Sequence, residues 1–221
     1  MAALTTEQLE CLLDCVVANS TRVLGVFPAN CIPLRCTTTM VDQHILQSNL
    51  ATPTERHPQL DVTQRYCFVL NTHPSGSPGE HWLAFFFNPT TQKLEYFDSF
   101  GFPLSMYAAV NAALDACRLL SICVRANTLG MLQSTTTTVC GHYCVAFIHW
   151  RAAHANTSLT TFASHIMSTH TAAEQRDRII VTSLRTITRK HPCCAAQLDG
   201  RSGTQAACAS RFSQSCCCRG T

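Results

Sequence analysis

The sequence predicts an α+β fold, in which a small mixed or antiparallel sheet is flanked by helices. Three short segments rich in aromatic and β-branched residues follow one another within residues 66–98. Segments with apolar residues at helical spacing precede them and dominate the second half of the chain. With 221 residues, of which 46% are hydrophobic and only 13% charged, the chain is long and apolar enough for one globular domain.

The first predicted element is a helix that starts after Thr5. Thr5 and Gln8 have the spacing of a capping box, in which each side chain hydrogen-bonds the backbone N–H of the other residue. Apolar residues then repeat at helical spacing to about Ala18, and they form one face. These residues are Leu9, Leu12, Leu13, Val16 and Val17.

Three strands are predicted next, over residues 66–71, 81–87 and 94–98. If they form an antiparallel meander, His81 begins the central strand and Asp98 ends the last one. Two such ends lie at the same edge of an antiparallel sheet. The sequence therefore predicts that His81 and Asp98 are neighbours.

Helices are predicted through most of the second half, because apolar residues recur there at helical spacing. The expected bounds are residues 105–117, 140–153, 159–168 and 171–190, with a short strand at residues 121–125. Ser105 is expected to cap the first of these helices. Thr171 and Glu174 have capping-box spacing and predict the start of the last one.

The last ~30 residues lose this periodicity. Six of the 15 cysteines lie there, at positions 193, 194, 208, 216, 217 and 218. We expect residues 1–190 to form one folded domain and residues 191–221 to form a flexible, cysteine-rich tail.

The composition also narrows the expected location and partners. The first residues lack a basic segment followed by an apolar one, so we expect no secretion, reduced thiols and an intracellular protein in the nucleus or cytoplasm. No run approaches the ~18 apolar residues of a membrane helix, so no membrane partner is expected. A net charge of +3 does not by itself indicate nucleic-acid binding.

Cys140 is the candidate nucleophile. A helix that begins at residue 140 would place its sulfur at the helix N-terminus, where unpaired N–H groups and the helix dipole favour a thiolate. Gly141 is expected to leave room beside it for a substrate backbone. A lone cysteine is more often an inert core residue, so the surrounding residues have to decide between the two roles.

Three further side chains complete a set suited to thiol chemistry. His81 would take or share the thiol proton, and Asp98 would hydrogen-bond the other ring nitrogen. Gln133 would donate its amide N–H to an oxyanion, together with the backbone N–H of Cys140. Taken singly, each has an ordinary alternative, namely a strand-end histidine, a turn aspartate and an exposed loop glutamine.

Two other groups of residues could form a binding site, but each also has a simpler explanation. Four potential metal ligands, Cys140, His142, Cys144 and His149, match no standard zinc spacing, and we predict no metal site. The basic residues Arg178, Arg185 and Arg189 share one helical face. We expect that face to be solvated, with a contact to nucleic acid or an acidic partner as the alternative.

The order of the four residues resembles that of the adenovirus protease family. The histidine precedes the acid by 17 residues, and the glutamine precedes the cysteine by seven. The motifs that carry the resemblance are His81-Trp82, Phe97-Asp98-Ser99-Phe100-Gly101, Gln133 and Cys140-Gly141. It covers the chain from about Val23 to about Trp150. The chain is also similar, more distantly, to SUMO-deconjugating proteases of the same clan, and viral-type relatives occur in virus-like DNA transposons.

The resemblance implies a papain-like active-site groove with a permuted chain order of His, Asp, Gln and Cys. It implies His81 as general base or ion-pair partner, Asp98 as orienting acid, Gln133 as oxyanion donor and Cys140 as nucleophile. Many adenoviral enzymes carry glutamate where this chain has Asp98, whereas the SUMO-directed branch uses aspartate. The resemblance also implies that no cofactor is required, that DNA stimulates the enzyme, and that a viral peptide forms a disulfide with it, for which Cys123 is the candidate.

The leading hypothesis is therefore a cysteine endopeptidase that cleaves capsid and core precursor proteins of a virus or virus-like element, in the host cell and in the virion. Two alternatives stay open. One is an isopeptidase that removes ubiquitin or a ubiquitin-like modifier. The other is an inactive relative that serves as a binding module.

Overall fold

The computed structural model of the protein describes residues 2–17, 20–29, 63–73, 80–118, 123–126, 130–154, 156–169 and 172–189. Residues 191–221, predicted to be a tail, lie outside these ranges. In the described part of the chain, no helix has the length and apolar content needed to span a bilayer.

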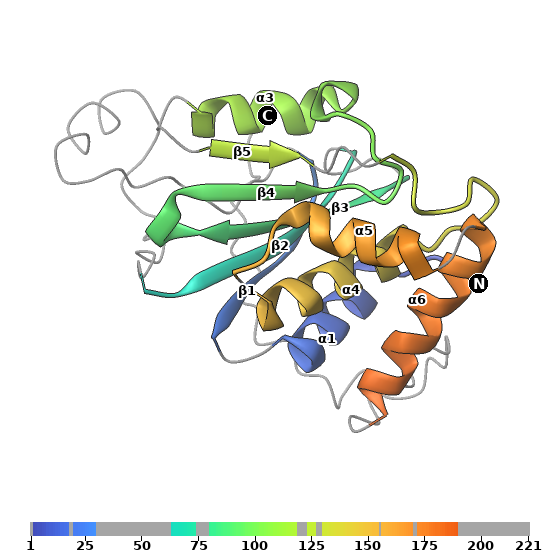
Figure 1. Ribbon diagram of the computed structural model, residues 1–221. Helices are drawn as coiled ribbons and strands as arrows, with labels where there is room; N and C mark the ends of the chain where they lie inside the picture. The colour runs from blue at the N-terminus through green and yellow to red at the C-terminus, as the bar shows by residue number, and fades with distance from the viewer. Residues whose placement is uncertain are drawn as a thin grey trace, which may run out of the picture.

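Five strands form one mixed sheet in the order β1-β2-β3-β4-β5 (Figure 1). Their bounds are β1 (Thr21–Phe27), β2 (Arg65–Asn71), β3 (Trp82–Asn88), β4 (Lys93–Phe97) and β5 (Cys123–Ala126). Strands β2, β3 and β4 are the predicted antiparallel meander, and β1 and β5 pair in parallel with its two outer strands. The predicted α+β fold with a small mixed sheet is confirmed.

Strand β1 is not predicted from the sequence. The strand contains Gly25 at φ 134°, and its pairing with β2 shifts register between Val23 and Gly25. A glycine at positive φ interrupts the alternation of inward and outward side chains. The segment therefore lacks the period-two pattern by which a strand is recognised.

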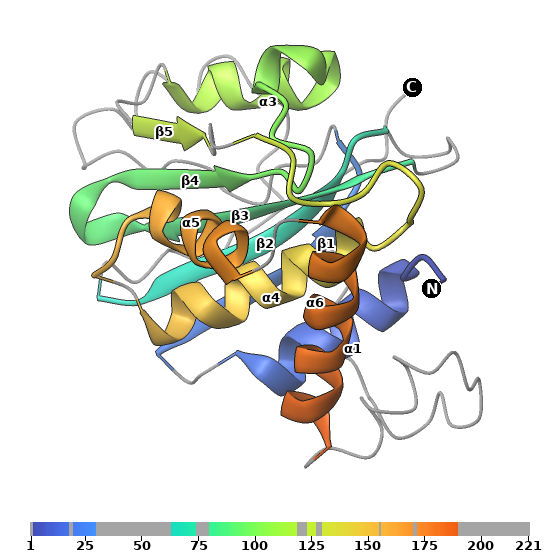
Figure 2. The same cartoon turned by 45° about the vertical axis from the view of Figure 1, so that its right-hand side comes forward.

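Helices cover both faces of the sheet (Figures 1 and 2). One face carries α1 (Thr6–Val16), α4 (Cys140–Ala153), α5 (Leu159–Thr169) and α6 (Ala173–Thr188). The other carries α3 (Ala108–Arg118) and the 3-10 turn η2 (Leu104–Met106), while the 3-10 turn η1 (Pro89–Thr91) joins β3 to β4.

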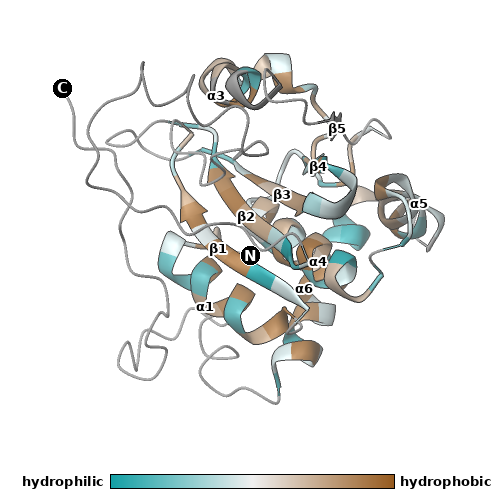
Figure 3. Ribbon diagram, turned by 90° about the vertical axis from the view of Figure 1, so that its left-hand side faces the viewer, coloured by the Kyte–Doolittle hydropathy of each residue, from teal (hydrophilic) through white to brown (hydrophobic). Residues whose placement is uncertain are grey.

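The central strands supply apolar side chains to two separate cores, which is why β2 and β3 are mostly brown in Figure 3. Along β3, Ala84 and Phe86 pack toward α1 and α4, whereas Leu83 and Phe85 pack toward α3. Full burial of one such large side chain contributes about 1.5–3 kcal/mol. The two cores fix the sheet between its helices, and the edge where the strands end carries the site described below.

Of the three predicted helix caps, the one at the N-terminus of α1 is present in the structure and the other two are not. The capping box of α1 is confirmed, since Thr5 Oγ1 accepts from the Gln8 N–H and Gln8 Oε1 accepts from the Thr5 N–H. The cap at Ser105 is wrong, because Ser105 lies inside η2 and α3 begins at Ala108. This 3-10 turn ends with its own hydrogen bond before the α-helix starts.

The capping box predicted for α6 is also wrong. The N-cap is Ala172, which makes no side-chain cap hydrogen bond, and α6 begins at Ala173. Glu174 Oε1 instead accepts a hydrogen bond from Ser134 Oγ at 2.9 Å. Glu174 therefore bonds to a residue distant in the sequence instead of a backbone N–H at the start of its own helix.

The state of the cysteines differs in part from the expectation that they are reduced. Cys11 and Cys15 of α1 are disulfide-bonded, whereas Cys67, Cys140 and Cys144 are free. The expectation rested on the lack of a secretion signal, which carries no information on which sulfur atoms lie within bonding distance.

Candidate active site

Cys140 is the first residue of α4, and its side chain is buried in a pocket wall. Val139 occupies the N-cap position and has no polar side-chain atom with which to cap the helix. The first N–H groups of α4 and the positive end of the helix dipole therefore face the space around Cys140. This is the placement that the sequence predicts.

His81 lies just before β3 and Asp98 just after β4, at one edge of the sheet, as predicted. His81 Nε2 donates to Asp98 Oδ1 at 2.6 Å. Because Nε2 is engaged by Asp98, Nδ1 is the ring nitrogen left for Cys140. Burial by itself would lower the pKa of His81, but hydrogen bonds to Asp98 and Cys140 and the charges of both raise this pKa to about 9.

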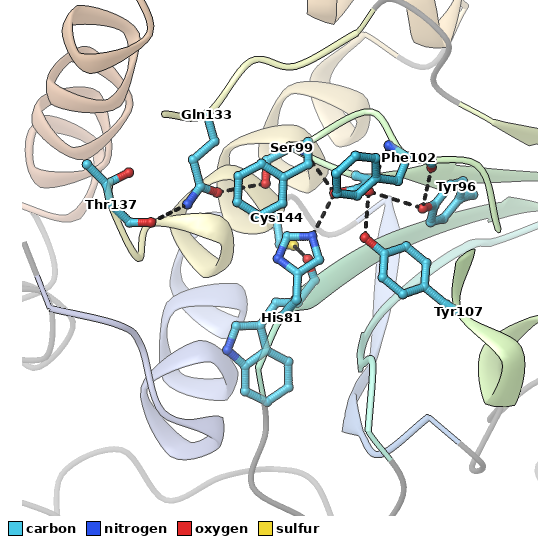
Figure 4. A network of polar contacts seen from close by, with 11 residues as sticks. His81, Tyr96, Ser99, Phe102, Tyr107, Gln133, Thr137 and Cys144 are labelled. Atoms are coloured by element: carbon cyan, nitrogen blue, oxygen red, sulfur yellow. Dashed lines mark hydrogen bonds and ion pairs between the residues drawn. The ribbon is translucent and has the colours of Figure 1, made fainter. Parts of the chain in front are cut away.

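Asp98 is fully buried and is held by several donors besides His81. They are the backbone N–H groups of Phe100 (2.9 Å) and Phe102 (3.0 Å) and the hydroxyls of Tyr107 (2.9 Å) and Tyr96 (3.4 Å). Burial, followed by the charge of Asp98, raises the pKa of both tyrosines, so both hydroxyls stay protonated. A buried carboxylate with this many donors has a fixed orientation. Figure 4 labels four of the residues around it, namely His81, Tyr96, Phe102 and Tyr107.

The rings around His81 limit its movement. The Phe100 ring stacks on the imidazole with centroids 4.8 Å apart, and the Tyr107 ring lies 6.1 Å away. The sequence analysis assigns no role to Phe100, Tyr96 or Tyr107. The aromatic residues within ten positions of Asp98 could have indicated that aromatic rings surround the site. A similar density of aromatic residues is also typical of a hydrophobic core, so the pattern did not distinguish the two.

Gln133 lies in the loop between β5 and α4 and is only 1% exposed, which rules out the exposed loop glutamine. Its Oε1 accepts from Ser99 Oγ at 2.8 Å, and its Nε2 donates to the Thr137 carbonyl oxygen at 2.8 Å (Figure 4). An amide nitrogen carries two hydrogens, so a second N–H is left for a substrate oxygen. The sequence analysis does not identify Ser99 as the residue that orients this amide.

These residues surround one pocket of about 660 Å³. His81, Gln133 and Cys140 line it, whereas Asp98 lies behind His81 and does not. The remaining walls come from residues 3–7, from residues 26–28 at the end of β1, and from Asn71, His73, Glu80, Trp82, Phe100, Thr137 and Thr138. The structure thus brings together all four residues that the sequence singles out.

Gly141 does not open toward a substrate as the sequence analysis expects. A Cβ atom at this position would lie 3.2 Å from Leu9 Cδ2 and 3.3 Å from Leu4 Cβ. The glycine therefore allows α4 to approach the N-terminal segment closely. That segment also accepts a hydrogen bond at the Leu4 carbonyl oxygen from Trp82 Nε1 at 3.2 Å.

The other candidate metal ligands of α4 have separate surroundings. Burial raises the pKa of Cys144 well above its usual value, and its thiol donates to the Trp82 carbonyl oxygen at 3.3 Å. Burial and the charge of Arg185 lower the pKa of His142 to about 4. His149 Nδ1 contacts the Val16 carbonyl oxygen at 2.7 Å. Over the described ranges, no group of three or more His, Cys, Asp and Glu side chains is arranged to hold a metal ion.

Two further predicted positions lie away from this pocket. Cys123 begins β5, and its side chain lies outside the part of the chain that is described, so its assignment to a peptide disulfide stays a prediction. Arg178, Arg185 and Arg189 are exposed, which is consistent with a solvated face.

The site combines a free thiol at a helix N-terminus, an imidazole paired with a buried carboxylate, and a side-chain amide, all at one pocket. This arrangement is found in thiol peptidases. The class indicated by the fold and the site is a protease. This chain belongs to the adenovirus endoprotease family, since a sequence model of that family matches residues 54–191, more than half of the chain.

Individual relatives are similar over a shorter stretch. The protease of Porcine adenovirus A serotype 3 is 26% identical over 103 residues, which are 40% of this chain and 48% of that protein. The protease of Human adenovirus D serotype 17 is 29% identical over 102 residues, 38% of this chain and 46% of that protein. The chain thus spans about half the length of the curated relatives it matches.

The fold is shared with a solved structure of a more distant protein. The Chlamydia trachomatis effector protein Cdu1, solved bound to ubiquitin, superposes with a TM-score of 0.51 at 14% identity, over 85% of this chain and 93% of that chain. At this identity the similarity concerns the fold alone.

Proposed function

We propose that the protein is a cysteine endopeptidase that cleaves structural precursor proteins of a virus or virus-like element. One observation carries the proposal. A buried His81–Asp98 pair, with Nε2 and Oδ1 2.6 Å apart, adjoins a free cysteine at a helix N-terminus. Membership of a protease family supports the reaction class.

In this mechanism the Cys140 thiolate attacks the carbonyl carbon of a peptide bond, and the carbonyl π electrons move to the oxygen. The second Gln133 N–H and the backbone N–H of Cys140 donate to that oxyanion. The C–N bond then breaks, and His81 Nδ1–H protonates the departing amine. A water molecule, deprotonated by His81, hydrolyses the thioester and restores the thiol.

The same proposal includes the substrates and activators that the family suggests. They are capsid and core precursors, cleaved in the nucleus or cytoplasm of the host cell or in the virion. DNA, and a peptide bound by a disulfide to Cys123, would act as activators. The pocket walls beside Cys140 leave space for an extended substrate segment.

Substitution of Cys140 by alanine tests the function. The Cys140→Ala chain should keep its fold by circular dichroism and lose cleavage of candidate precursors, because it lacks the thiol that hydrogen-bonds His81. The assay should be run with and without DNA, in the presence of reductant. Substantial cleavage by Cys140→Ala would refute the assignment.

Fluorogenic substrates distinguish the endopeptidase from its alternatives. A panel of viral-type peptides beside ubiquitin- and SUMO-derived substrates would identify an isopeptidase by preferential turnover of the modifier substrates. If Cys140 fails to react with iodoacetamide at neutral pH, the chain is an inactive relative instead.

A further inference from the structure

We propose that Asp177, in α6, is a positioning residue that holds the oxyanion donor Gln133 in place. The inference rests on the proposed function, because it concerns the same reaction. It assigns a role to α6, whose side chains do not line the pocket. The sequence analysis gives Asp177 no role.

Asp177 is fully buried and accepts hydrogen bonds from three residues that lie 34 to 43 positions earlier in the chain. Its carboxylate accepts from the Ser134 N–H at 3.2 Å, from Thr137 Oγ1 at 2.6 Å and from the Tyr143 hydroxyl at 3.0 Å. Ser134 is the residue directly after Gln133. Asp177 therefore binds the first and the last residue of the turn Ser134–Thr137, which directly follows Gln133.

Thr137 links Asp177 to the amide. Its hydroxyl donates to Asp177, and its carbonyl oxygen accepts from Gln133 Nε2 at 2.8 Å. Ser99 holds the other end of the same amide through Oε1 at 2.8 Å. With the amide held at both ends, the direction of its remaining N–H depends on where Thr137 lies.

Two neighbours of Asp177 in α6 bind the same loop. Arg176 Nε donates to the Leu132 carbonyl oxygen at 2.9 Å, and Glu174 accepts from Ser134 Oγ at 2.9 Å. In both ribbon views the loop before α4 runs beside the N-terminal end of α6 (Figures 1 and 2). The first turns of α6 thus form a support for the loop, with the buried carboxylate at its centre.

The test compares two reactions of the Cys140 thiol, of which only one forms an oxyanion. Alkylation by iodoacetamide displaces iodide at a saturated carbon and needs no oxyanion donor. Acylation by p-nitrophenyl acetate passes through a tetrahedral oxyanion and needs one. The other cysteines are accounted for by subtracting the rates of Cys140→Ser and by locating the label with mass spectrometry.

Asp177→Asn keeps the shape of the side chain but turns one acceptor into a donor that faces other donors. Thr137→Val removes the hydroxyl and keeps the carbonyl oxygen. Each should lower Cys140-dependent acylation about 10- to 100-fold, because misplacement of a catalytic group by about 1 Å has an effect of that size. Alkylation should stay within about twofold, and Thr137→Ser should restore most of the acylation.

Leu184→Ala is the matched control, since Leu184 is a fully buried core residue of α6 without a hydrogen bond to the loop. It should destabilise the protein while leaving acylation per folded molecule unchanged. The inference is overturned if Asp177→Asn and Thr137→Val leave acylation unchanged, or if they lower acylation and alkylation equally. If the unsubstituted chain shows no Cys140-dependent reaction with either reagent, the proposed function itself fails.

Discussion

At the scale of single residues, His81 combines a raised pKa with a position between a buried carboxylate and a thiol. Its pKa of about 9 lies above the ordinary value of 6.5, and its partners Asp98 and Cys140 are buried with it. A histidine with a raised pKa stays protonated at neutral pH and forms the cationic half of an ion pair. The site therefore holds a protonated imidazole that is ion-paired with Asp98 and hydrogen-bonded to Cys140.

This shift predicts how stability depends on pH. Because the folded pKa is raised, the stabilisation is fully present below pH 6.5 and is lost as the pH rises through about 9. Its size is roughly 3 kcal/mol, since one pKa unit corresponds to about 1.36 kcal/mol. Urea unfolding between pH 6 and pH 9.5 should show the unsubstituted protein losing more stability than His81→Asn. Parallel pH profiles for the two proteins would contradict the ion pair.

Tyr107 gives a second prediction at this scale. Tyr107→Phe removes one donor from a buried carboxylate, and a hydrogen bond to a charged group contributes about 1.5–3 kcal/mol. The free energy of unfolding should fall by about that amount. Tyr96→Phe is the control for Asp98, because the Tyr96 hydroxyl lies 3.4 Å from that carboxylate and donates mainly to the Phe102 carbonyl oxygen at 2.9 Å. Activity per folded molecule should also fall more in Tyr107→Phe than in Tyr96→Phe, and the reverse order would show that Tyr107 is not the stronger donor to Asp98.

The site could be predicted from the sequence as a set of residues but not as a network. His81, Asp98, Gln133 and Cys140 were recognised because their chemistry and spacing are visible along the chain. The groups that hold them, such as Ser99 on Gln133, are common residue types without a sequence signature. Only the fold reveals which of them are close enough to bind.

At the scale of elements, two loops meet at a pair of glycines. A Cβ atom at Gly101 (φ +69°) would lie 2.6 Å from the Gly130 backbone, whereas a Cβ atom at Gly130 (φ +87°) would have no atom within 4 Å. Gly101 follows Asp98 in its loop, and Gly130 precedes the loop of Gln133. Close approach of these two backbones brings the loop that follows Asp98 beside the loop of Gln133, where the Ser99 carbonyl oxygen accepts from the Gln133 N–H at 3.0 Å.

The glycine pair can be tested by two single substitutions. Gly130→Ala should lower stability by about 1–2 kcal/mol, the amount that a left-handed backbone conformation costs a residue with a Cβ. Gly101→Ala should cost about 1–3 kcal/mol more, because it also forces the loops apart. It should also reduce activity per folded molecule. Equal stability losses for the two variants, measured by thermal unfolding, would rule out the close contact.

An ion pair joins α4 to the sheet from the far end of the helix. Arg151 Nε and Nη2 donate to the two carboxylate oxygens of Glu95 at 2.6 and 3.0 Å, and both side chains are buried. Arg151 also donates to the carbonyl oxygens of His154 and Thr157. The pair fixes α4 against β4, so that the helix presents Cys140 at the opposite end.

Substitution of Arg151 alone should lower the free energy of unfolding more than substitution of Arg151 and Glu95 together. Arg151→Met leaves Glu95 buried without its partner and should lower the free energy of unfolding by about 3–5 kcal/mol. The double variant Arg151→Met/Glu95→Gln should recover part of that loss. Denaturant unfolding of the three proteins measures the difference, and a double variant less stable than Arg151→Met would contradict the account.

At the scale of the whole molecule, the sheet is the frame on which distant segments meet. His81 and Asp98 come from neighbouring strand ends, Cys140 from α4, and Gln133 from a loop held by α6. Two apolar cores, one on each face of the sheet, keep these elements in register.

The sequence by itself determined most of the helices and strands and a set of four candidate site residues. The capping box of α1, the strands of the meander and the helix that starts at Cys140 each depend on a pattern within one segment. Neighbouring residues impose such patterns through helical and strand periodicity, so they can be recognised without a fold.

Only the tertiary structure decided how the site is held. It placed Glu174 on Ser134 rather than at a cap, turned Gly141 toward Leu4 and Leu9, and bound Asp177 to the loop of Gln133. These contacts join residues far apart in the chain, and a buried polar group takes whichever partner the packing brings within reach. Because packing is set by the whole chain at once, no local pattern could have predicted these partners.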